Sequence, residues 1–322
     1  MKAIVRDQYG SPDVLRLEEI AQPVVQDHDV LVRVRSASVN VADWMALRGR
    51  PYAVRAAYGG FRRPKNRVLG KDVAGTVAAV GRSVQRLQES DEVFGLCGGA
   101  FAEYVRVAED ALVRKPIGLT FEQAAAVPLA AATALRNLRD IGEIRPGHRV
   151  LINGASGGVG SFAIQIAKWL GAEVTGVCST RNLDLIRSIG ADHVIDYTQE
   201  DFTRHDRLYD VIFDNVMNHS LSECRHALKP EGTLILNNGT AGGPWIGPLG
   251  RMAVALLQSR FIRQRVRLAA LPNKADMVLL KERIEAGDLT PVVDRTYPLA
   301  ETPQALRYLG RGHARGKVVI CV

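Results

Sequence analysis

Residues 150–170, VLINGASGGVGSFAIQIAKWL, decide the fold. A short apolar run ends at Asn153, a turn rich in glycine follows, and an amphipathic helix begins at once. A dinucleotide-binding turn needs small residues here, because the chain turns tightly, its backbone approaches a pyrophosphate, and the helix packs closely on the strand. Ala155 stands at the first small position, and Gly157 and Gly160 at the second and third. The segment predicts a dinucleotide site, and the alternative is a glycine turn with a purely structural role.

The helix that leaves this turn presents its free N–H groups and the positive end of its dipole to the space above the turn. Both features suit a pyrophosphate. The residues expected to bind the cofactor here are Ala155, Ser156, Gly157, Gly158, Val159 and Gly160.

The next expected strand, 173–178, ends in Ser179, Thr180 and Arg181. An NAD-type site places an Asp or Glu about 20 residues beyond the glycines to bind the ribose 2′-hydroxyl. A carboxylate would repel a 2′-phosphate, whereas Arg181 would pair with one through charge-assisted hydrogen bonds. We therefore predict NADPH rather than NADH, and the alternative is that Arg181 starts a helix and points to water.

On the two sides of about residue 120 the sequence predicts different patterns of secondary structure. From about Thr120 helices and strands alternate, which is typical of a parallel sheet covered on both faces. Before that point, 29–39 alternates apolar and polar residues as a strand with one wet face does. Further strands are expected at 67–81, 91–96, 101–107, 149–153, 193–195, 210–214, 232–237, 266–271, 292–297 and 317–322, with helices at 121–140 (interrupted near Pro128), 159–170, 182–189 and 219–228.

The composition is that of an ordinary globular protein. The chain has 322 residues, 47% hydrophobic and 24% charged, with a mean hydropathy of −0.03. The four cysteines form no C-x-x-C pair, so structural zinc and a disulfide scaffold are not expected. Residues 1–10 have no apolar core of a signal peptide, and 124–135 is too short to cross a bilayer. A cytoplasmic location is expected.

The net charge of +8 favours anionic ligands or partners. Basic residues cluster at 62–67, 260–267 and 311–317, and the plainest interpretation of the first two clusters is a solvated face. A nucleic-acid-binding or sensor protein that carries NADPH but turns over little is one alternative function. It is disfavoured because aromatic residues are sparse and no RNA-binding module is recognisable.

Several ordered motifs resemble the medium-chain dehydrogenase/reductase superfamily. They are SVNVADW (38–44), VLGKDVAGTVAAVG (68–81), DEVFG (91–95), FAEYV (101–105) and the glycine turn itself. Within the superfamily the chain is most similar to the zinc-free quinone oxidoreductase branch, which includes zeta-crystallin and is akin to enoyl reductases. The resemblance implies an α/β protein with a β-rich GroES-like catalytic domain and an inserted Rossmann domain with a doubly wound parallel sheet. The expected boundaries are 1–122 and 272–322 for the catalytic domain and 123–271 for the Rossmann domain.

The chain departs from the zinc alcohol dehydrogenase pattern at the metal ligands. Asn40 replaces a catalytic Cys, Gly70-Lys71-Asp72 replaces Gly-His-Glu, and Ala130 and Ala131 lie near the third ligand. A protonated Lys does not bind zinc and Ala has no donor atom, so no metal is expected. Lys71 and Asp72 are expected to form a salt bridge there rather than to take part in catalysis.

Without a metal, reduction of a plain ketone lacks the Lewis acid that stabilises an alkoxide. A quinone or an α,β-unsaturated carbonyl accepts hydride at carbon and spreads the charge, so hydrogen-bond donors aimed at the oxygen suffice. The prediction is an NADPH-dependent, metal-free oxidoreductase acting on a small-molecule quinone or enone. An enoyl-thioester or enone reductase is the alternative within enzymes, decided by the loop 49–67.

The resemblance also implies site residues. Asn40 would orient the nicotinamide or the substrate carbonyl, and Tyr52 would bind the substrate or relay a proton; a turn amide and ordinary packing are the structural alternatives. The other cofactor residues implied are Thr133, Tyr197, Asn215, Val216, Asn238, Gly239, Thr240 and Arg311, with Lys317 as an alternative to Arg311 beside the adenosine phosphate. The edge strand at 266–271 could pair with a second copy in a homodimer.

Overall fold

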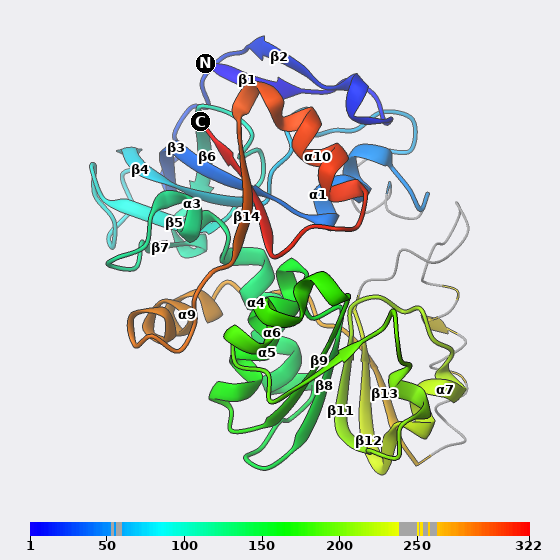
Figure 1. The fold of residues 1–322 in the computed structure, drawn as a ribbon. Coiled ribbons are helices and arrows are strands. Elements are labelled where there is room, and N and C mark those ends of the chain that lie inside the picture. Colours follow the sequence, from blue (N-terminus) through cyan, green and yellow to red (C-terminus); the bar gives the residue numbers. More distant parts are fainter. Residues whose placement is uncertain (53–54, 56–59, 238–249, 251, 254–256, 258–262) are drawn as a thin grey trace. The chain divides into compact units, whose positions relative to one another are not determined.

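The computed structural model describes residues 1–322 except 53–54, 56–59, 238–249, 251, 254–256 and 258–262. The described chain forms two compact units (Figure 1). The first unit comprises 1–132, 273–287 and 291–322, and the second comprises 133–272 and 288–290. The first unit is therefore built from both ends of the chain, as the resemblance implied for the catalytic domain.

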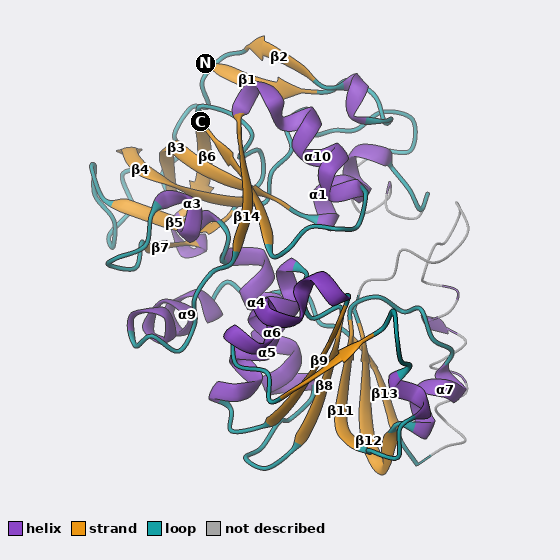
Figure 2. Ribbon diagram, viewed as in Figure 1, coloured by secondary structure: helices purple, strands orange, loops and turns teal. Residues whose placement is uncertain are grey.

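A seven-stranded sheet forms the centre of the first unit (Figure 2). Its order is β14-β15-β3-β4-β5-β7, with β6 also paired to β3. All neighbours are antiparallel except β14 and β15. The strands are β3 (Asp29–Val39), β4 (Asp72–Val80), β5 (Glu92–Leu96), β6 (Tyr104–Ala108), β7 (Leu112–Arg114), β14 (Val293–Pro298) and β15 (Lys317–Cys321). The alternation in 29–39 therefore predicted β3, which is the longest strand of this sheet and pairs with β4, β6 and β15.

Apolar faces of the sheet and of short helices make the core of the first unit. Phe101, Val32 and Ile320 are among its fully buried side chains. A separate antiparallel pair, β1 (Lys2–Val5) and β2 (Arg16–Glu19), lies at the start of the chain. The helices are α1 (Val41–Arg48), α3 (Phe121–Ala125), α9 (Asp276–Glu285) and α10 (Thr302–Gly310), and α4 (Pro128–Arg136) continues into the second unit.

The second unit contains a six-stranded sheet that is parallel throughout. Its order is β10-β9-β8-β11-β12-β13, which in chain order is the doubly wound dinucleotide-binding arrangement 3-2-1-4-5-6. The strands are β8 (Arg149–Asn153), β9 (Glu173–Cys178), β10 (His193–Asp196), β11 (Tyr209–Asp214), β12 (Leu228–Leu236) and β13 (Arg265–Leu268). α5 (Gly158–Trp169) packs on β8 and β9, α6 (Leu183–Ser188) on β9 and β10, and α7 (Leu221–His226) on β12. The predicted fold class is confirmed.

Most expected elements are present with small shifts at their ends. The helix at 121–140 is divided at Pro128 into α3 and α4, because proline lacks the N–H group and disfavours helical geometry in the residue before it. The helix α1 was not predicted. No helix among the described residues is long and apolar enough to cross a bilayer.

Candidate functional site

The glycine turn joins β8 to α5 as the sequence predicts. Gly154 has φ +76°, a backbone conformation that glycine adopts without strain. A Cβ on Gly160 would lie 2.2 Å from the Gly154 carbonyl oxygen, so the close contact of helix and strand requires glycine there. A Cβ on Gly157 would meet only that same oxygen, at 3.4 Å. Space above Gly157 is therefore open, as a backbone that approaches a pyrophosphate needs.

The N-terminus of α5 is available to an anion. Gly157 is its N-cap residue, and the turn after it contributes Gly158, Val159 and Gly160. The first N–H groups of a helix have no partner within the helix, and they carry the positive end of its dipole. Ala155 is buried, with its N–H bonded to the Val177 carbonyl at 3.0 Å. The arrangement fits a dinucleotide pyrophosphate.

Residues expected near the 2′-phosphate lie at the carboxyl ends of the neighbouring strands β9 and β10. Asp196, the last residue of β10, accepts hydrogen bonds from the hydroxyls of Thr180 and Thr198. The bond from Thr180 holds the pKa of Asp196 below its ordinary value. Tyr197 follows Asp196, is 56% exposed, and donates its N–H to Cys178 at the end of β9.

Arg181 is exposed at the carboxyl end of β9, within the short helical turn Thr180–Asn182. Ser179 is the residue before that turn. The buried Asn182 donates to the hydroxyls of Ser156, at 2.9 Å, and Ser179. Asn182 therefore ties the glycine turn to the segment that carries Arg181.

A polar network lies at the topological switch point, where β8 and β11 are adjacent. Asn153 donates from Nδ2 to Asp214 Oδ1 at 2.9 Å, and Asp214 Oδ1 also accepts the N–H of Val216 at 3.0 Å. Asn215 donates its side-chain amide to the Asn153 carbonyl at 3.2 Å and accepts from Asn237 at 2.7 Å. A ligand of a doubly wound sheet binds at this edge, so the structure brings Asn215 and Val216 next to the glycine turn.

Thr133 is nearly buried in α4, and its carbonyl accepts from Asn137 at 2.8 Å. Asn238, Gly239 and Thr240 lie outside the described residues. Arg311 is exposed directly after α10, in the first unit.

A buried polar cluster in the first unit surrounds Asn40. Asn40 follows β3, caps α1, and is 7% exposed. Its Nδ2 donates to Asp72 Oδ2 at 3.0 Å and to the Ser38 carbonyl at 3.3 Å, and its Oδ1 accepts from Lys317 Nζ. Both amide hydrogens are therefore engaged within the protein, while the oxygen keeps a second lone pair.

Asp72 carries the negative charge of this cluster. It is fully buried, accepts from Ser38 Oγ at 2.6 Å and from the Leu129 N–H at 2.9 Å, and lies 3.3 Å from Lys317 Nζ. The side chain of Lys317 is itself only 3% exposed. The ion pair of Asp72 is thus made with Lys317 of β15, not with Lys71 as expected. The alternative that Lys317 replaces Arg311 beside the adenosine phosphate is wrong, because its ammonium is held here.

A second buried carboxylate, Asp43, holds the start of α1. Its two oxygens accept the N–H groups of Asn40, at 3.0 Å, and Gly70, at 3.1 Å. Burial and the neighbouring Asp72 raise the pKa of Asp43 to about 6. Burial and the same carboxylates raise the pKa of the Cys97 thiol as well.

These donors do not fit zinc. The cluster offers an amide, a lysine ammonium and carboxylates already bonded to N–H and O–H groups, whereas zinc prefers thiolates and imidazoles. The described residues include no group of three or more His, Cys, Asp or Glu that could hold a metal. The Lys317 ammonium supplies a positive charge beside Asp72 and Asn40 without coordination chemistry.

Tyr52 follows α1 by four residues and is partly buried. Two guanidinium groups lie over its ring, that of Arg55 at 4.6 Å from the ring centre and that of Arg50 at 5.9 Å. The sequence did not predict the roles of Asp43 and Asp196, and it did not predict that Lys317 contacts Asn40. Asn40 and Asp43 are spaced as a capping box, which was a readable signal for α1. No local signal joins Lys317 to Asn40, since 277 positions separate them.

Comparisons with known proteins agree with this architecture. Residues 26–117 match the family "Alcohol dehydrogenase GroES-like domain", and residues 189–320 match "Zinc-binding dehydrogenase". The mouse mitochondrial NAD(P)H oxidoreductase RTN4IP1 is 33% identical over 100% of this chain and 89% of its own length. The chloroplastic NADPH-dependent alkenal/one oxidoreductase of Arabidopsis thaliana is 34% identical over 99% of this chain and 79% of its own.

Among solved structures, the quinone oxidoreductase from Coxiella burnetii matches with a TM-score of 0.87 and 29% identity. The match covers 100% of this chain and 99% of that one. Relatives that match along essentially the whole chain share both the GroES-like and the dinucleotide-binding parts. The chain therefore belongs to the medium-chain dehydrogenase/reductase superfamily, in its quinone oxidoreductase branch, and is an oxidoreductase.

Proposed function

We propose that the protein uses NADPH, without a metal ion, to reduce a conjugated carbonyl compound, either a quinone or an α,β-unsaturated carbonyl. The observation that carries the proposal is the buried Lys317 ammonium bonded to Asn40 and Asp72, a donor set that does not suit zinc. A conjugated acceptor needs no Lewis acid, because hydride adds at carbon and hydrogen bonds stabilise the oxygen that becomes negative.

Bound NADPH supplies the hydride. The chain's own contribution begins with binding: the N-terminus of α5 faces the pyrophosphate, and Ser179, Thr180 and Arg181 face the 2′-phosphate. Asp196 accepts a hydrogen bond from the Thr180 hydroxyl, which fixes the position of Thr180. It also accepts one from Thr198, so both of its carboxylate oxygens are hydrogen-bonded to hydroxyl groups. The name of the Arabidopsis relative, NADPH-dependent alkenal/one oxidoreductase, supports both the cofactor and the acceptor class.

Asn40 acts through its oxygen in this proposal. Both Nδ2 hydrogens are donated to Asp72 and Ser38, so a further donation to the substrate would break a buried bond. The remaining lone pair of Oδ1 can accept the carboxamide N–H of the nicotinamide. We assign Tyr52 as the donor to the acceptor's oxygen, with solvent water as an equally suitable source of the final proton.

The further cofactor residues remain as the sequence predicted them. Thr133, Asn215 and Val216 would lie near the nicotinamide ribose and carboxamide, with Tyr197 and Arg311 toward the adenosine phosphate. Asn238, Gly239 and Thr240 complete the predicted set.

The test follows absorbance at the reduced-nicotinamide band. NADPH and NADH are each supplied with a quinone, an enone, an enoyl thioester and a simple aldehyde, with and without chelator. We expect NADPH oxidation by conjugated acceptors that the chelator does not change, and little with the aldehyde. Chelator-sensitive aldehyde reduction would contradict the metal-free mechanism.

Arg181→Ala tests the cofactor preference. Loss of its charge-assisted bonds should raise the KM for NADPH roughly tenfold or more and leave the KM for NADH nearly unchanged. Arg187→Ala is the matched control, because Arg187 is exposed on α6 and pairs with Asp184. An unchanged ratio of the two KM values would refute the assignment of Arg181.

Two further predictions concern the protein as a whole. The strand β13 is an edge of the described parallel sheet, and we propose that it pairs with a second copy in a homodimer; light scattering of the purified protein measures this directly. A cytoplasmic location stays a prediction, and relatives are named mitochondrial and chloroplastic.

A further inference from the structure

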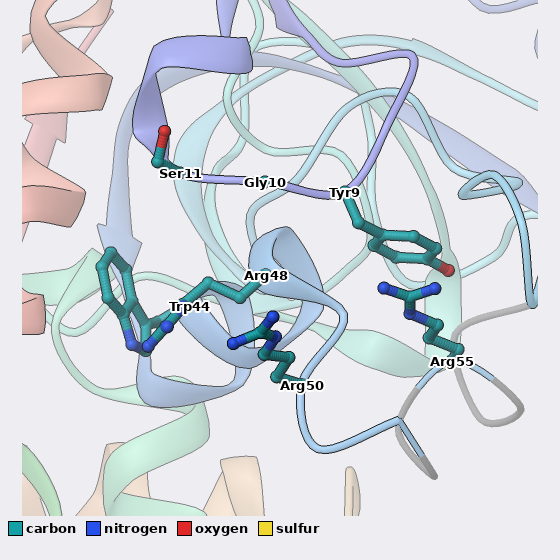
Figure 3. A pocket seen from close by; sticks show the side chains of 7 residues that line it. All are labelled: Tyr9, Gly10, Ser11, Trp44, Arg48, Arg50 and Arg55. Carbon is teal, nitrogen blue, oxygen red and sulfur yellow. The ribbon is translucent and has the colours of Figure 1, made fainter. Parts of the chain in front are cut away.

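The first unit contains a cavity of about 530 Å³ that none of the assignments above uses. It is lined by Tyr9, Gly10, Ser11, Trp44, Arg48, Arg50 and Arg55 (Figure 3). A volume of this size accommodates a small-molecule ligand or a substantial part of one. We call it the arginine pocket, because three of the seven lining residues carry a guanidinium group.

Aromatic rings hold two of these guanidinium groups in place. Arg48 lies over the Trp44 ring at 5.4 Å from its centre, and Arg55 lies over the Tyr9 ring at 4.6 Å. In Figure 3 the Arg50 guanidinium is drawn between these two pairs. A guanidinium group over a ring can still donate its in-plane N–H groups to carboxylate or phosphate oxygens. In Arg55, Nε and Nη1 already donate to carbonyl oxygens, so Nη2 is the nitrogen without a recorded acceptor among the described residues.

Two glycines allow the walls of the pocket to approach each other. Gly49 ends α1 with φ +54°, and a Cβ there would lie 2.6 Å from the Tyr9 ring and 2.8 Å from Arg55 Nε. A Cβ on Gly310 would lie 2.5 Å from the Trp44 ring, so α10 supports that ring closely. The Tyr9 hydroxyl is fixed by a 2.7 Å bond to the Gly60 carbonyl. Packing therefore positions Tyr9, Trp44 and Arg55, whereas Arg48 and Arg50 are exposed residues of the lining.

The positive charge of the pocket is not neutralised from within. In the described part of the chain no carboxylate forms an ion pair with Arg48, Arg50 or Arg55. Arg55 instead donates to the carbonyls of Gly49, at 3.0 Å, and Phe61, at 2.9 Å. At the rim, Ser11 turns its hydroxyl to Asp13, which pairs with Arg307.

A buried cation behind the pocket adds to this field. Arg6 is 1% exposed, lies 5.3 Å from the centre of the Tyr9 ring, and donates from Nη1 to the Ala46 carbonyl. Its Nε has no hydrogen-bond partner among the described residues. The buried Asp43 partly compensates the charge of Arg6. The guanidinium groups that line the cavity itself have no ion pair among the described residues, and such charge favours an anionic ligand.

The position of the pocket relates it to Asn40. Asn40 caps α1, Trp44 stands one turn along, and Arg48 is the last residue of the helix. At 1.5 Å per residue, Arg48 is roughly 12 Å from Asn40 along the axis. We propose that the arginine pocket binds an anionic group of the acceptor, a phosphate or a carboxylate, carried about one α1 length from its conjugated carbonyl. This inference rests on the proposed function, because it describes the substrate of the same site.

The test compares charged and uncharged acceptors of the same reactive type. Crotonoyl-CoA carries phosphates and crotonoyl-N-acetylcysteamine does not; 11-oxododec-9-enoate carries a carboxylate about one α1 length from its carbonyl when extended, and its methyl ester does not. In the double variant Arg48→Gln/Arg50→Gln, the KM for at least one charged acceptor should rise roughly tenfold to a hundredfold. The KM for its uncharged counterpart, the KM for NADPH and both kcat values should stay within about twofold. The phosphate and carboxylate pairs show which anion the pocket takes.

The matched control is Arg62→Gln/Arg63→Gln, which removes the same charge from exposed positions outside the pocket. An equal rise in KM in this control would mean that only the overall charge matters and would overturn the proposal. So would an unchanged KM for both charged acceptors, or an equal rise for charged and uncharged ones.

Failure of the proposed function would look different, since no acceptor would then oxidise NADPH even with the unaltered protein. Binding to the pocket is measured without turnover by titrating the saturated analogues butanoyl-CoA and 11-oxododecanoate and following tryptophan fluorescence. A saturable change that Trp44→Phe and the double variant abolish supports the pocket, and no change with either analogue refutes it.

Discussion

Replacing Lys317 with methionine removes a buried positive charge and keeps a side chain of similar length. The change removes the cation that pairs with the fully buried Asp72 and that also lowers the pKa of the nearby Asp43. Breaking a buried ion pair by removing one partner costs about 3–5 kcal/mol, because an uncompensated charge stays buried. We expect Lys317→Met to lower the free energy of unfolding by about that amount at pH 8, measured by urea denaturation.

The penalty should depend on pH in a defined direction. Lys317 lowers the pKa of Asp43, so removing Lys317 raises that pKa further above its value in the unfolded chain. The folded variant then binds more protons than the unfolded chain, and its penalty shrinks as pH falls from 8 to 5, by at most about 1.4 kcal/mol per pH unit. Asp72→Asn in the Lys317→Met background should recover part of the loss.

Lys281→Met is the control, because Lys281 pairs with Glu285 at 3.3 Å on the accessible surface of α9 in the same unit. This variant should lose less than about 0.5 kcal/mol. A loss below about 1 kcal/mol for Lys317→Met at pH 8, or the same loss at pH 5 and pH 8, would refute the account of the cluster.

Three other predictions follow from the described geometry. Gly160→Ala should destabilise the protein by more than about 1 kcal/mol, because the added Cβ meets backbone atoms, whereas Gly157→Ala should keep the stability but weaken NADPH binding at least tenfold. Gly98→Ala is the neutral control, because a Cβ there would have no atom within 4 Å. Equal effects of Gly160→Ala and Gly157→Ala would contradict the assignment of the glycine turn. Because the pKa of Asp43 is raised to about 6, the unfolding free energy of the unaltered protein, relative to Asp43→Asn, should fall by roughly 2 kcal/mol as pH rises from 4 to 6. A flat difference across a pH series of urea titrations would show that Asp43 does not titrate there. Two cysteines are buried and two are partly buried. A thiol reagent at pH 8 should therefore label the native protein slowly, and it should label all four thiols at once in denaturant. Rapid stoichiometric labelling of the folded protein would show that its thiols are accessible.

The parallel sheet could be predicted because its information is local. Apolar strands, the glycine turn and the regular alternation with helices mark each element, and the strands 149–153 and 173–178 were placed at their observed ends. The helix α1 was missed because its buried residues, Asp43, Ala46 and Leu47, include a carboxylate and form no clear apolar stripe over its eight residues. Its start was signalled by Asn40 and Asp43 rather than by periodicity.

The candidate site was predictable to the extent that it lies in one stretch of chain. The residues of the glycine turn and of 179–181 follow from their position after strands. The surroundings of Asn40 do not, because Asp72 and Lys317 reach it through the antiparallel pairing of β3 with β4 and β15. Such pairings depend on tertiary register, which neither spacing nor composition encodes.

The contribution of β15 to the first unit has a consequence for synthesis on the ribosome. Lys317 and β15 follow β13 in the chain, so they leave the exit tunnel after the last strand of the second unit. The second unit needs little beyond 133–272, so it can complete its sheet while the first unit still lacks a strand and the counter-ion for Asp72. Although domains generally fold in the order in which they are made, the unit that begins first here is completed last, and a nascent chain stalled before β15 would expose an unpaired edge of β3.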